Sequence, residues 1–251
     1  MNKIWIGNGQ LVLPDKIVPG GSVLLEGKKI AAVNVPCPPD ARRVDVDGSY
    51  IMAGFMDEDA SAFPAIAKAH CAHGTTALCP TTMTCADSLL EKTIDLFLEA
   101  DKEPENGAEL LGLHLEGPYF SAASKGAQPI GEQRIPERED LERILRRAKG
   151  SILRWDAAPE LPNMELFAKV MAENGVLASL AHSAATAPEA LRAFDWGFSH
   201  VTHFYNACTT FHKKNGLVYS GIVEATYLRD DVTIELIGDG RHIPRESMLL
   251  A

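Results

Sequence analysis

From about residue 50 onward, short apolar runs alternate with segments of helical character. The apolar runs fall at 76–79, 110–115, 153–157, 176–181, 200–203 and 232–237. The helix-like stretches include 65–72, 88–100, 138–148, 164–174 and 188–196. Such alternation is typical of βαβ units around a parallel sheet, and the chain has no G-x-G-x-x-G fingerprint of a doubly wound sheet. The pattern therefore predicts an α/β fold with most of a TIM-type (β/α) barrel, in which chemistry sits at the carboxyl ends of the strands.

The first 48 residues differ from the rest of the chain. Strand-like runs at 4–6, 10–13, 22–25 and 29–33 are separated by the turn-forming strings Gly7-Asn8-Gly9, Pro19-Gly20-Gly21 and Glu26-Gly27-Lys28. Short strands spaced by about ten residues favour a small all-β unit. We therefore predict two domains, a small β portion over 1–48 and the barrel portion over 49–251.

Composition excludes several classes of protein. The chain has 251 residues, 46% of them hydrophobic, and a formal net charge of −10, which argues against nucleic-acid binding as its main task. It has no run of 18 apolar residues, so no membrane span is expected. The five cysteines form no C-x-x-C pair, and the amino terminus turns polar too early for a signal peptide. These features predict reduced thiols and a cytoplasmic location.

One strand-like run ends in a carboxylate. Because side chains alternate along a strand, His114 and Glu116 share one face while Leu113 and Leu115 share the other. The Gly-Pro pair that follows Glu116 stops the strand there. A carboxylate at the tip of an apolar barrel strand needs a partner, because burying it alone is costly. A salt bridge to a basic side chain and a metal ion both satisfy this requirement.

Two histidines follow the later apolar runs. His182 comes directly after the run at 176–181, and His203 ends the run at 200–203. The 21 residues between them fit one loop–helix–strand unit, so the two histidines are expected at adjacent strand ends. With Glu116 on a third strand, they predict a metal site. One carboxylate and two imidazoles with an open position suit Zn²⁺ or Fe²⁺ and leave room for water.

Weaker candidates also occur. His242 follows an apolar run. It either faces the carboxyl ends of the strands, like the three candidate ligands, or lies in a plain Asp-Gly turn. His70 and His73 have the i, i+3 spacing of a chelating pair but precede the next strand rather than follow it. Cys208 has no neighbour in sequence that would activate a thiolate. Lys214 belongs to a basic pair that either binds a substrate anion or is simply solvated.

Several motifs, in order along nearly the whole chain, resemble those of the N-acetylglucosamine-6-phosphate deacetylases of the amidohydrolase superfamily. The strings are His114-Leu115-Glu116-Gly117-Pro118, Ala181-His182-Ser183-Ala184-Ala185-Thr186, Thr202-His203-Phe204-Tyr205-Asn206-Ala207 and Asp239-Gly240-Arg241-His242. They correspond to the family's HLEGP, GHSNAT, THLYNA and ADGxH patterns. Ordered motifs together are a stronger signal than any one of them.

The resemblance implies a fold, a reaction and a site. It implies a β-sandwich portion before the barrel, and hydrolysis of N-acetylglucosamine 6-phosphate to glucosamine 6-phosphate and acetate. One divalent ion, Zn²⁺ or Fe²⁺, would be held by Glu116, His182 and His203, and the working protein would be a homodimer. The family's sugar-phosphate contacts fall on Ala127, Gln128, Asn206, Ala207, Lys214, Asp239, Gly240, Arg241 and His242.

The chain also departs from the family pattern. The family's D-x-H-x-H-G segment has no match, because Gly54 runs directly into Phe55. Asp59 and Ser61 are the nearest substitutes for its two histidines. The family's catalytic aspartate, in a T-D-A motif, and the last barrel strands have no match either, so the general base is unassigned. Lys214 stands where arginine is frequent, which keeps the charge but loses the bidentate fork.

These departures keep two alternatives open. The chain could be a truncated relative that binds a sugar phosphate or a metal without turnover. It could also be another amidohydrolase that acts on a cyclic amide. Ligand-induced stabilisation without acetate release would distinguish the first alternative, and a substrate panel the second.

Overall fold

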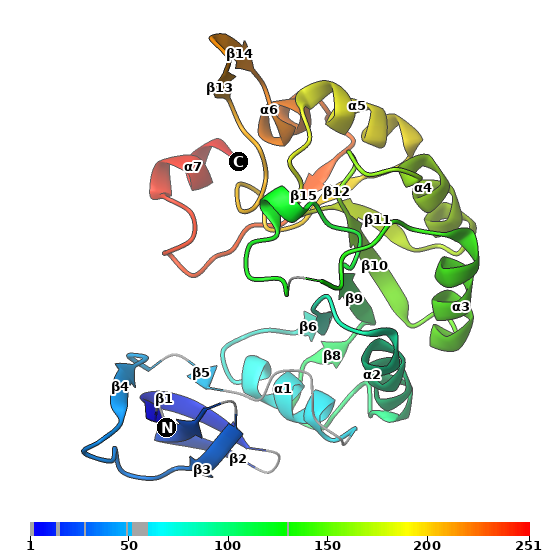
Figure 1. Cartoon of the computed structure of the whole chain (residues 1–251). Helices are drawn as coiled ribbons and strands as arrows, with labels where there is room; N and C mark the ends of the chain where they lie inside the picture. Colours follow the sequence, from blue (N-terminus) through cyan, green and yellow to red (C-terminus); the bar gives the residue numbers. More distant parts are fainter. Residues whose placement is uncertain (1–2, 14–15, 28, 49, 52–59, 130) are drawn as a thin grey trace. The chain divides into compact units, whose positions relative to one another are not determined.

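The computed structural model describes residues 3–13, 16–27, 29–48, 50–51, 60–129 and 131–251 (Figure 1). The chain forms two compact units. The first comprises Met1–Leu78 and Glu99–Leu111, and the second comprises Cys79–Leu98 and Gly112–Ala251. The predicted junction between Gly54 and Phe55, and Asp59 with it, lies outside the described residues.

The first unit contains a five-stranded sheet. Its strands are β1 (Lys3–Leu13), β2 (Lys16–Glu26), β3 (Lys29–Val33), β4 (Arg42–Asp45) and β5 (Tyr50–Ile51). β1 pairs antiparallel with β2 and parallel with β4 and β5, and β2 pairs antiparallel with β3. All the elements described before residue 60 are strands of this sheet, and a β-sandwich portion over 1–48 stays a prediction.

Two of the predicted breaks in this sheet are wrong. Gly7-Asn8-Gly9 lies inside β1, and Pro19-Gly20-Gly21 lies inside β2. The pairing register shifts on both sides of Gly9, so the irregular residues form bulges in one long hairpin rather than turns. The hydrogen bonds gained on either side of the bulges keep the strands continuous.

The rest of the first unit is small. Helix α1 (Ala62–Cys71) buries Phe63 and Ile66. The two short strands β6 (Ala77–Leu78) and β8 (Glu109–Leu110) pair in parallel.

The second unit is built on a parallel six-stranded sheet in the order β15-β12-β11-β10-β9-β7. Its strands are β7 (Thr81–Thr82), β9 (Leu113–Glu116), β10 (Ile152–Ala157), β11 (Leu177–Leu180), β12 (His200–Val201) and β15 (Thr233–Ile234). The predicted α/β class is confirmed by this sheet. The sheet is open between β7 and β15 in the described part, so a closed barrel stays a prediction.

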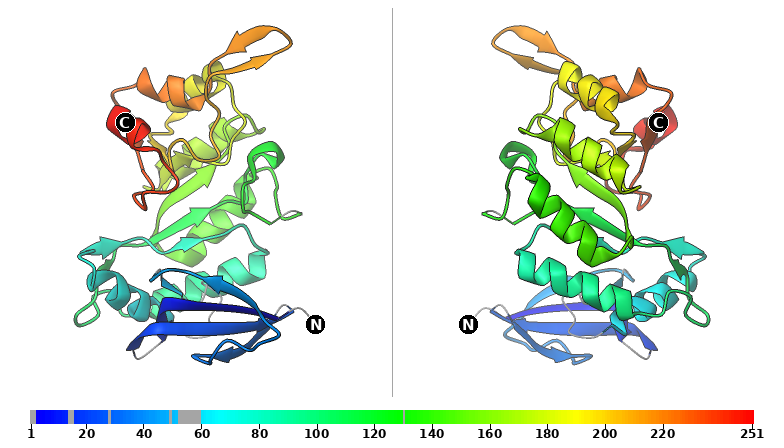
Figure 2. Two further views of the ribbon diagram at one scale, coloured as in Figure 1. Left: turned by 90° about the vertical axis from the view of Figure 1, so that its left-hand side faces the viewer. Right: turned by 90° about the vertical axis from the view of Figure 1, so that its right-hand side faces the viewer.

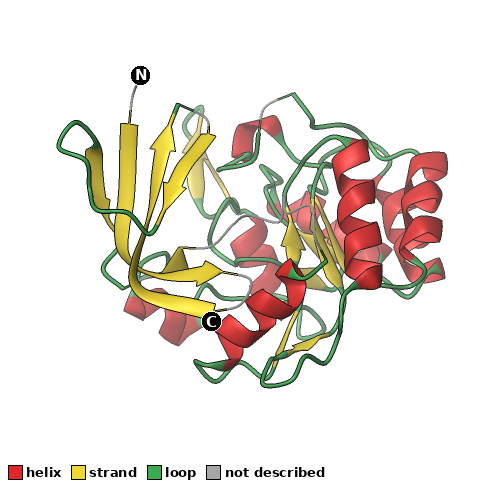
Figure 3. Ribbon diagram, turned by 90° about the horizontal axis from the view of Figure 1, so that it is seen from below, coloured by secondary structure: helices red, strands yellow, loops and turns green. Residues whose placement is uncertain are grey.

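Helices lie between and after these strands. They are α2 (Asp87–Glu99), α3 (Arg138–Ala148), α4 (Met164–Glu173), α5 (Ala187–Trp196), α6 (Ile222–Tyr227) and the terminal α7 (Arg245–Leu250). Figure 1 and Figure 2 show α3, α4 and α5 side by side on one face of the sheet, and Figure 3 shows a row of helices beside the strands. A one-turn 3₁₀ helix (Ala122–Ser124) and the hairpin β13 (His212–Lys214) and β14 (Leu217–Tyr219) lie in the connections.

Local sequence explains where α5 begins and ends. Thr186 is the N-cap of the helix, and Glu189 Oε2 accepts its N–H at 2.8 Å and its hydroxyl at 2.7 Å. Pro188 lies in the first turn, where its missing N–H costs nothing. Gly197 ends the helix in a left-handed conformation with φ 113°. The helix therefore carries the chain from one strand end to the start of the next strand.

The two faces of the sheet differ in polarity. On the helix-covered face, Trp155 packs with Tyr119 and Phe167, at ring-centroid distances of 5.7 and 6.0 Å. The indole N–H of Trp155 donates to the carbonyl of Gly117 at 2.9 Å. The alternate residues Arg154 and Asp156 point to the opposite face. Strands of a parallel sheet are usually apolar on both faces, so polar side chains on this inner face call for an explanation.

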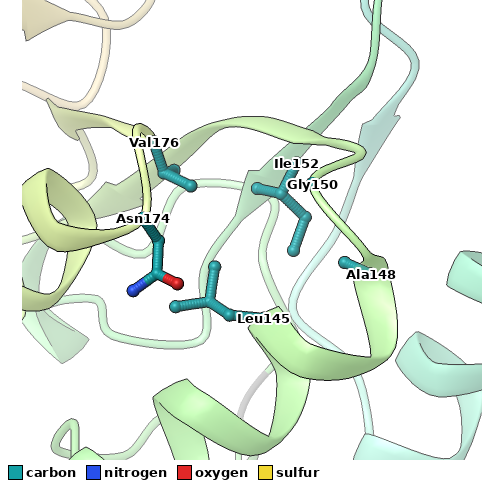
Figure 4. A pocket seen from close by; sticks show the side chains of 6 residues that line it. All are labelled: Leu145, Ala148, Gly150, Ile152, Asn174 and Val176. Atoms are coloured by element: carbon teal, nitrogen blue, oxygen red, sulfur yellow. The ribbon is translucent and has the colours of Figure 1, made fainter.

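A small pocket opens at the amino edge of the sheet (Figure 4). It lies between the ends of α3 and α4 and the starts of β10 and β11, with Leu145, Ile152 and Val176 among its lining residues. Glu116, by contrast, ends its strand at the carboxyl edge. Within the described residues, no helix is both long and apolar enough to cross a lipid bilayer.

Candidate metal centre

Three predicted ligands converge at the carboxyl edge of the sheet. Glu116 Oε1 lies 2.8 Å from His182 Nε2 and 3.2 Å from His203 Nε2. The two Nε2 atoms are 3.2 Å apart. Among the described residues, these three form the one group of histidine, cysteine and acidic side chains that could hold a metal ion. The structure thus brings together the set that strand-end reasoning selected.

Backbone conformation aims each ligand into the site. Glu116 ends β9, and Gly117 follows with φ 97°. A Cβ at Gly117 would lie 2.1 Å from Thr84 Oγ1, so the turn requires glycine. His182 and His203 follow β11 and β12 with φ of 45° and 37°. A non-glycine residue in this left-handed region costs about 1–3 kcal/mol, a strain that clusters at functional sites.

Each imidazole has its proton fixed by a backbone carbonyl. His182 Nδ1 lies 3.1 Å from the carbonyl oxygen of Ser124, and His203 Nδ1 lies 2.9 Å from that of Asn206. A carbonyl only accepts, so each Nδ1 must carry a hydrogen, which leaves Nε2 of the neutral ring as a lone pair. Two lone pairs and a carboxylate oxygen then face one another with no donor among them. A cation resolves this arrangement, and the donor set fits a divalent metal.

Without a metal, a proton takes the place of the cation. Burial acts to raise the pKa of Glu116, but hydrogen bonds from His182 and His203 outweigh it and lower the pKa to about 2. Burial acts to lower the pKa of His203, but the hydrogen bond and charge of Glu116 outweigh it and raise the pKa. The site therefore favours positive charge between its three ligands.

The neighbouring loops hold His182 in place. The ring of Phe120 lies 4.5 Å from that of His182, centroid to centroid. A Cβ at Gly126 would lie 3.2 Å from His182 Cε1, so the backbone of Gly126 packs against the ring. Glu160 accepts hydrogen bonds from Ser183 Oγ and the Ala184 N–H, both at 2.6 Å. The loop after His182 is therefore tied to the loop after β10.

Two of the predicted substrate contacts, Gln128 and Asn206, have side chains whose surroundings the structure describes. Gln128 is buried, and its Oε1 accepts the Thr84 N–H at 2.9 Å, so it ties two loops together. Asn206 Nδ2 is a buried donor without a hydrogen-bond partner in the described part of the chain. A buried donor left unpaired is costly unless a ligand completes it. Asn206 is thus the predicted contact whose surroundings best fit a substrate.

The other predicted contacts are placed by their backbone or lie in an exposed turn. Ala127 is exposed in a turn. Ala207 has φ 49°, and its carbonyl accepts the Ser183 N–H at 3.1 Å. Lys214 ends β13. Asp239, Gly240, Arg241 and His242 form an exposed turn, in which Asp239 accepts the N–H groups of Arg241 and His242 and pairs with the His242 imidazole at 2.6 Å.

That turn has the exposure and the internal hydrogen bonds of an Asp-Gly turn. The hydrogen bonds from the two N–H groups and from His242 lower the pKa of Asp239 to about 2. None of the hydrogen bonds found for the described residues joins the turn to the three ligands. Substrate contact by this turn stays a prediction.

The rival candidates gain no support. His70 and His73 are exposed at the end of α1 and in the turn after it, and neither belongs to the metal-competent group in the described residues. Burial raises the pKa of the Cys208 thiol to about 12, so at neutral pH it is a protonated, poor nucleophile. All five cysteines are free thiols, as expected from their spacing.

Sequence reasoning missed the polar layer beneath the ligands. Asp156 is fully buried on the inner face, where His114 Nε2 lies 2.8 Å from its Oδ2. Thr202 Oγ1 donates to its Oδ1 at 2.9 Å. The available signal was Arg154 and Asp156 alternating with apolar residues inside the run at 153–157, because a charge inside a buried strand needs a partner.

Comparisons with known proteins point consistently to one enzyme name. No family model matches the chain. A Lysinibacillus sphaericus N-acetylglucosamine-6-phosphate deacetylase is 32% identical over 185 residues, which cover 71% of this chain and 45% of that protein. The Homo sapiens enzyme of the same name is 27% identical over 269 residues, 99% of this chain and 61% of that protein. The chain spans about half the length of the curated relatives it matches, from 42% to 62%.

Solved structures give the same answer. The crystal structure of N-acetylglucosamine-6-phosphate deacetylase from Pasteurella multocida superposes with a TM-score of 0.67 at 25% identity, covering 99% of this chain and 68% of that one. The Thermotoga maritima enzyme gives 0.64 at 28% identity, covering 98% and 66%. The parallel sheet and the donor set at its carboxyl edge define an α/β protein with a candidate metal site. More particularly, the chain is a homologue of the N-acetylglucosamine-6-phosphate deacetylases and covers part of their length.

Proposed function

We propose that this chain carries the metal-binding part of an enzyme that hydrolyses the N-acetyl group of N-acetylglucosamine 6-phosphate to glucosamine 6-phosphate and acetate. The observation that carries the proposal is the convergence of Glu116, His182 and His203 on one point, with both Nδ1 atoms committed to backbone carbonyls. The names of the relatives supply the substrate.

The residues of the chain would divide the work. Glu116, His182 and His203 would hold one Zn²⁺ or Fe²⁺, which when bound activates water and polarises the amide carbonyl. The unpaired Nδ2 of Asn206 would donate to the sugar phosphate. Ala127, Gln128, Ala207, Lys214 and the turn Asp239, Gly240, Arg241 and His242 would complete the substrate site. The general base remains to be assigned.

Acetate release tests the proposal. The protein as expressed from its native gene is stripped with a chelator, reloaded with Zn²⁺ or Fe²⁺ and assayed with N-acetylglucosamine 6-phosphate. We expect acetate release that depends on the metal and is lost in Glu116→Gln. Glu105→Gln, the same change at an exposed carboxylate, is the matched control and should retain full activity. Wild-type turnover in Glu116→Gln would refute the proposal.

The same assay separates the alternatives. Thermal stabilisation by the sugar phosphate without acetate release would favour a binding protein that does not turn over substrate. N-acetylgalactosamine 6-phosphate belongs in the substrate panel, because a deacetylase of that name from Escherichia coli O157:H7 is 29% identical over 196 residues. Turnover of a cyclic amide instead would favour a different amidohydrolase.

The finer structural expectations belong to the same proposal. They are a closed (β/α) barrel over 49–251, a β-sandwich portion that includes 1–48, a homodimer and a cytoplasmic location. The homodimer is checked by the mass of the native protein in solution, measured by light scattering during gel filtration.

A further inference from the structure

The inner face of the sheet carries a layer of charged and polar side chains next to the three ligands. It includes His114 on β9, Arg154 and Asp156 on β10, and His200 on β12. Glu235 directly follows β15. In the pairing register, Asp156 stands between Glu116 on one side and Ser179 on the other. This polar layer is therefore continuous with the metal centre.

Hydrogen bonds fix the protonation of the two histidines in the layer. Arg154 donates from Nη2 to His114 Nδ1 at 2.8 Å and from Nη1 to His200 Nε2 at 2.9 Å. Arginine has no acceptor and stays protonated, so both ring nitrogens must be lone pairs. His114 Nε2 lies 2.8 Å from Asp156 Oδ2, an ion-pair distance, and the remaining N–H of His200 donates to Thr233 Oγ1 at 2.7 Å.

The charges of the layer then form a simple balance. Arg154 is paired with Glu235, from Nη2 to Oε2 at 2.8 Å. Asp156 is fully buried, with His114 Nε2 2.8 Å from its Oδ2 and Arg154 Nε 4.0 Å from its Oδ1, at the outer limit of an ion pair. With histidine counted as neutral, the described inner face carries a net formal charge of −2, from the carboxylates of Glu116, Asp156 and Glu235 and the one guanidinium. That is the charge that one divalent cation neutralises, whereas Glu116 alone would leave a buried dication half balanced.

We propose that Asp156 is the buried counter-charge of the metal centre, a positioning residue that touches neither metal nor substrate. It acts in two ways. Its carboxylate supplies the second negative charge that a dication at Glu116 requires. Its Oδ1 also accepts a hydrogen bond from Thr202 Oγ1 at 2.9 Å, and Thr202 immediately precedes the ligand His203 in the chain. This inference rests on the proposed metal site.

The inference is tested by measuring metal affinity in two variants that change the charge of the layer in opposite directions. Asp156→Asn removes a negative charge, and Arg154→Gln removes a positive one while it can still donate to His114. The readouts are the Kd for Co²⁺, from competition with a chelator, and the visible d–d spectrum of the bound Co²⁺. We expect Asp156→Asn to weaken Co²⁺ binding roughly 10–100-fold and to shift the spectrum, as loss of an outer-layer partner does. Arg154→Gln should bind Co²⁺ more tightly than the wild type.

A neutral variant in the same layer provides the control. Ser179→Ala removes the hydroxyl that contacts Thr202 Oγ1 at 2.7 Å but changes no charge. Its Kd should stay well within tenfold of the wild type. A merely structural role for the layer would instead weaken binding in all three variants, which would overturn the inference.

Each remaining outcome decides a specific claim. Wild-type affinity in Asp156→Asn would overturn the inference and leave the metal site standing. Absence of Co²⁺ binding by the wild-type protein would overturn the metal site, and the inference with it. If Asp156→Asn does not fold, as judged by circular dichroism, Arg154→Gln decides alone: tighter binding supports the charge balance and weaker binding refutes it.

Discussion

Removing the charge of Glu116 should destabilise the metal-free protein in a pH-dependent way. In that protein, burial acts to raise the pKa of Glu116, but the hydrogen bonds from His182 and His203 lower it from 4.5 to about 2. Each pKa unit corresponds to about 1.4 kcal/mol, so the ionised Glu116 contributes about 3 kcal/mol to folding. The change Glu116→Gln removes this contribution.

The pH window follows from the directions of the two shifts. A lowered pKa gives stability that is present above the unfolded value of 4.5 and is lost as the pH falls through about 2. The raised pKa of His203 gives stability that is present below the unfolded value of 6.5 and is lost as the pH rises through the folded value. Both contributions are complete between pH 4.5 and 6.5, so the variant should lose most there.

Thermal unfolding of chelator-treated protein measures the effect. For a protein of this size, about 3 kcal/mol corresponds to a fall in Tm of roughly 6–12 °C. We expect this fall at pH 5.5 and a clearly smaller one at pH 9, because the contribution of His203 is lost as the pH rises through its raised pKa. Glu105→Gln is the control and should melt like the wild type at both pH values. Equal Tm values for Glu116→Gln and the wild type at pH 5.5 would refute the reasoning, as would an undiminished loss at pH 9.

Three further predictions concern the same unit. Metal binding should release about one proton per ion near pH 6 and fewer at pH 9, because the metal displaces a proton shared by Glu116 and His203. Calorimetry in two buffers of different ionisation enthalpy measures the number of protons released. Gly126→Ala should weaken metal binding about tenfold by pushing on His182, whereas Gly27→Ala, also at positive φ but in open space, should leave the metal Kd unchanged. Trp155→Phe should lower the free energy of unfolding by about 1–3 kcal/mol in urea titrations, because the buried Gly117 carbonyl loses its donor.

Much of the second unit could be predicted from local sequence patterns. The helix expected at 138–148 has those bounds in the structure, and the strands expected at 153–157 and 176–181 agree within one or two residues. The ligands were found because they end apolar runs, and the carboxyl ends of parallel strands share an edge. These are short-range signals that a single sequence carries.

The amino-terminal sheet shows where local signals mislead. Gly7-Asn8-Gly9 and Pro19-Gly20-Gly21 have the composition of turns but lie within two paired strands. Turn propensity is a local preference, and its free energy is much smaller than that of a long antiparallel ladder. Pairing with a partner strand therefore overrides it. The register that decides this outcome involves residues far apart in the chain.

The sequence by itself determined which side chains are available to the site and on which strand ends they stand. Only the tertiary structure decided their chemical state. The carbonyls of Ser124 and Asn206 set the ring tautomers of His182 and His203, and Arg154 sets that of His114. The partner of a ring nitrogen depends on the paths of loops from other strands and on the register between strands. Periodicity fixes the face on which a side chain lies, but it carries no information about what that face meets.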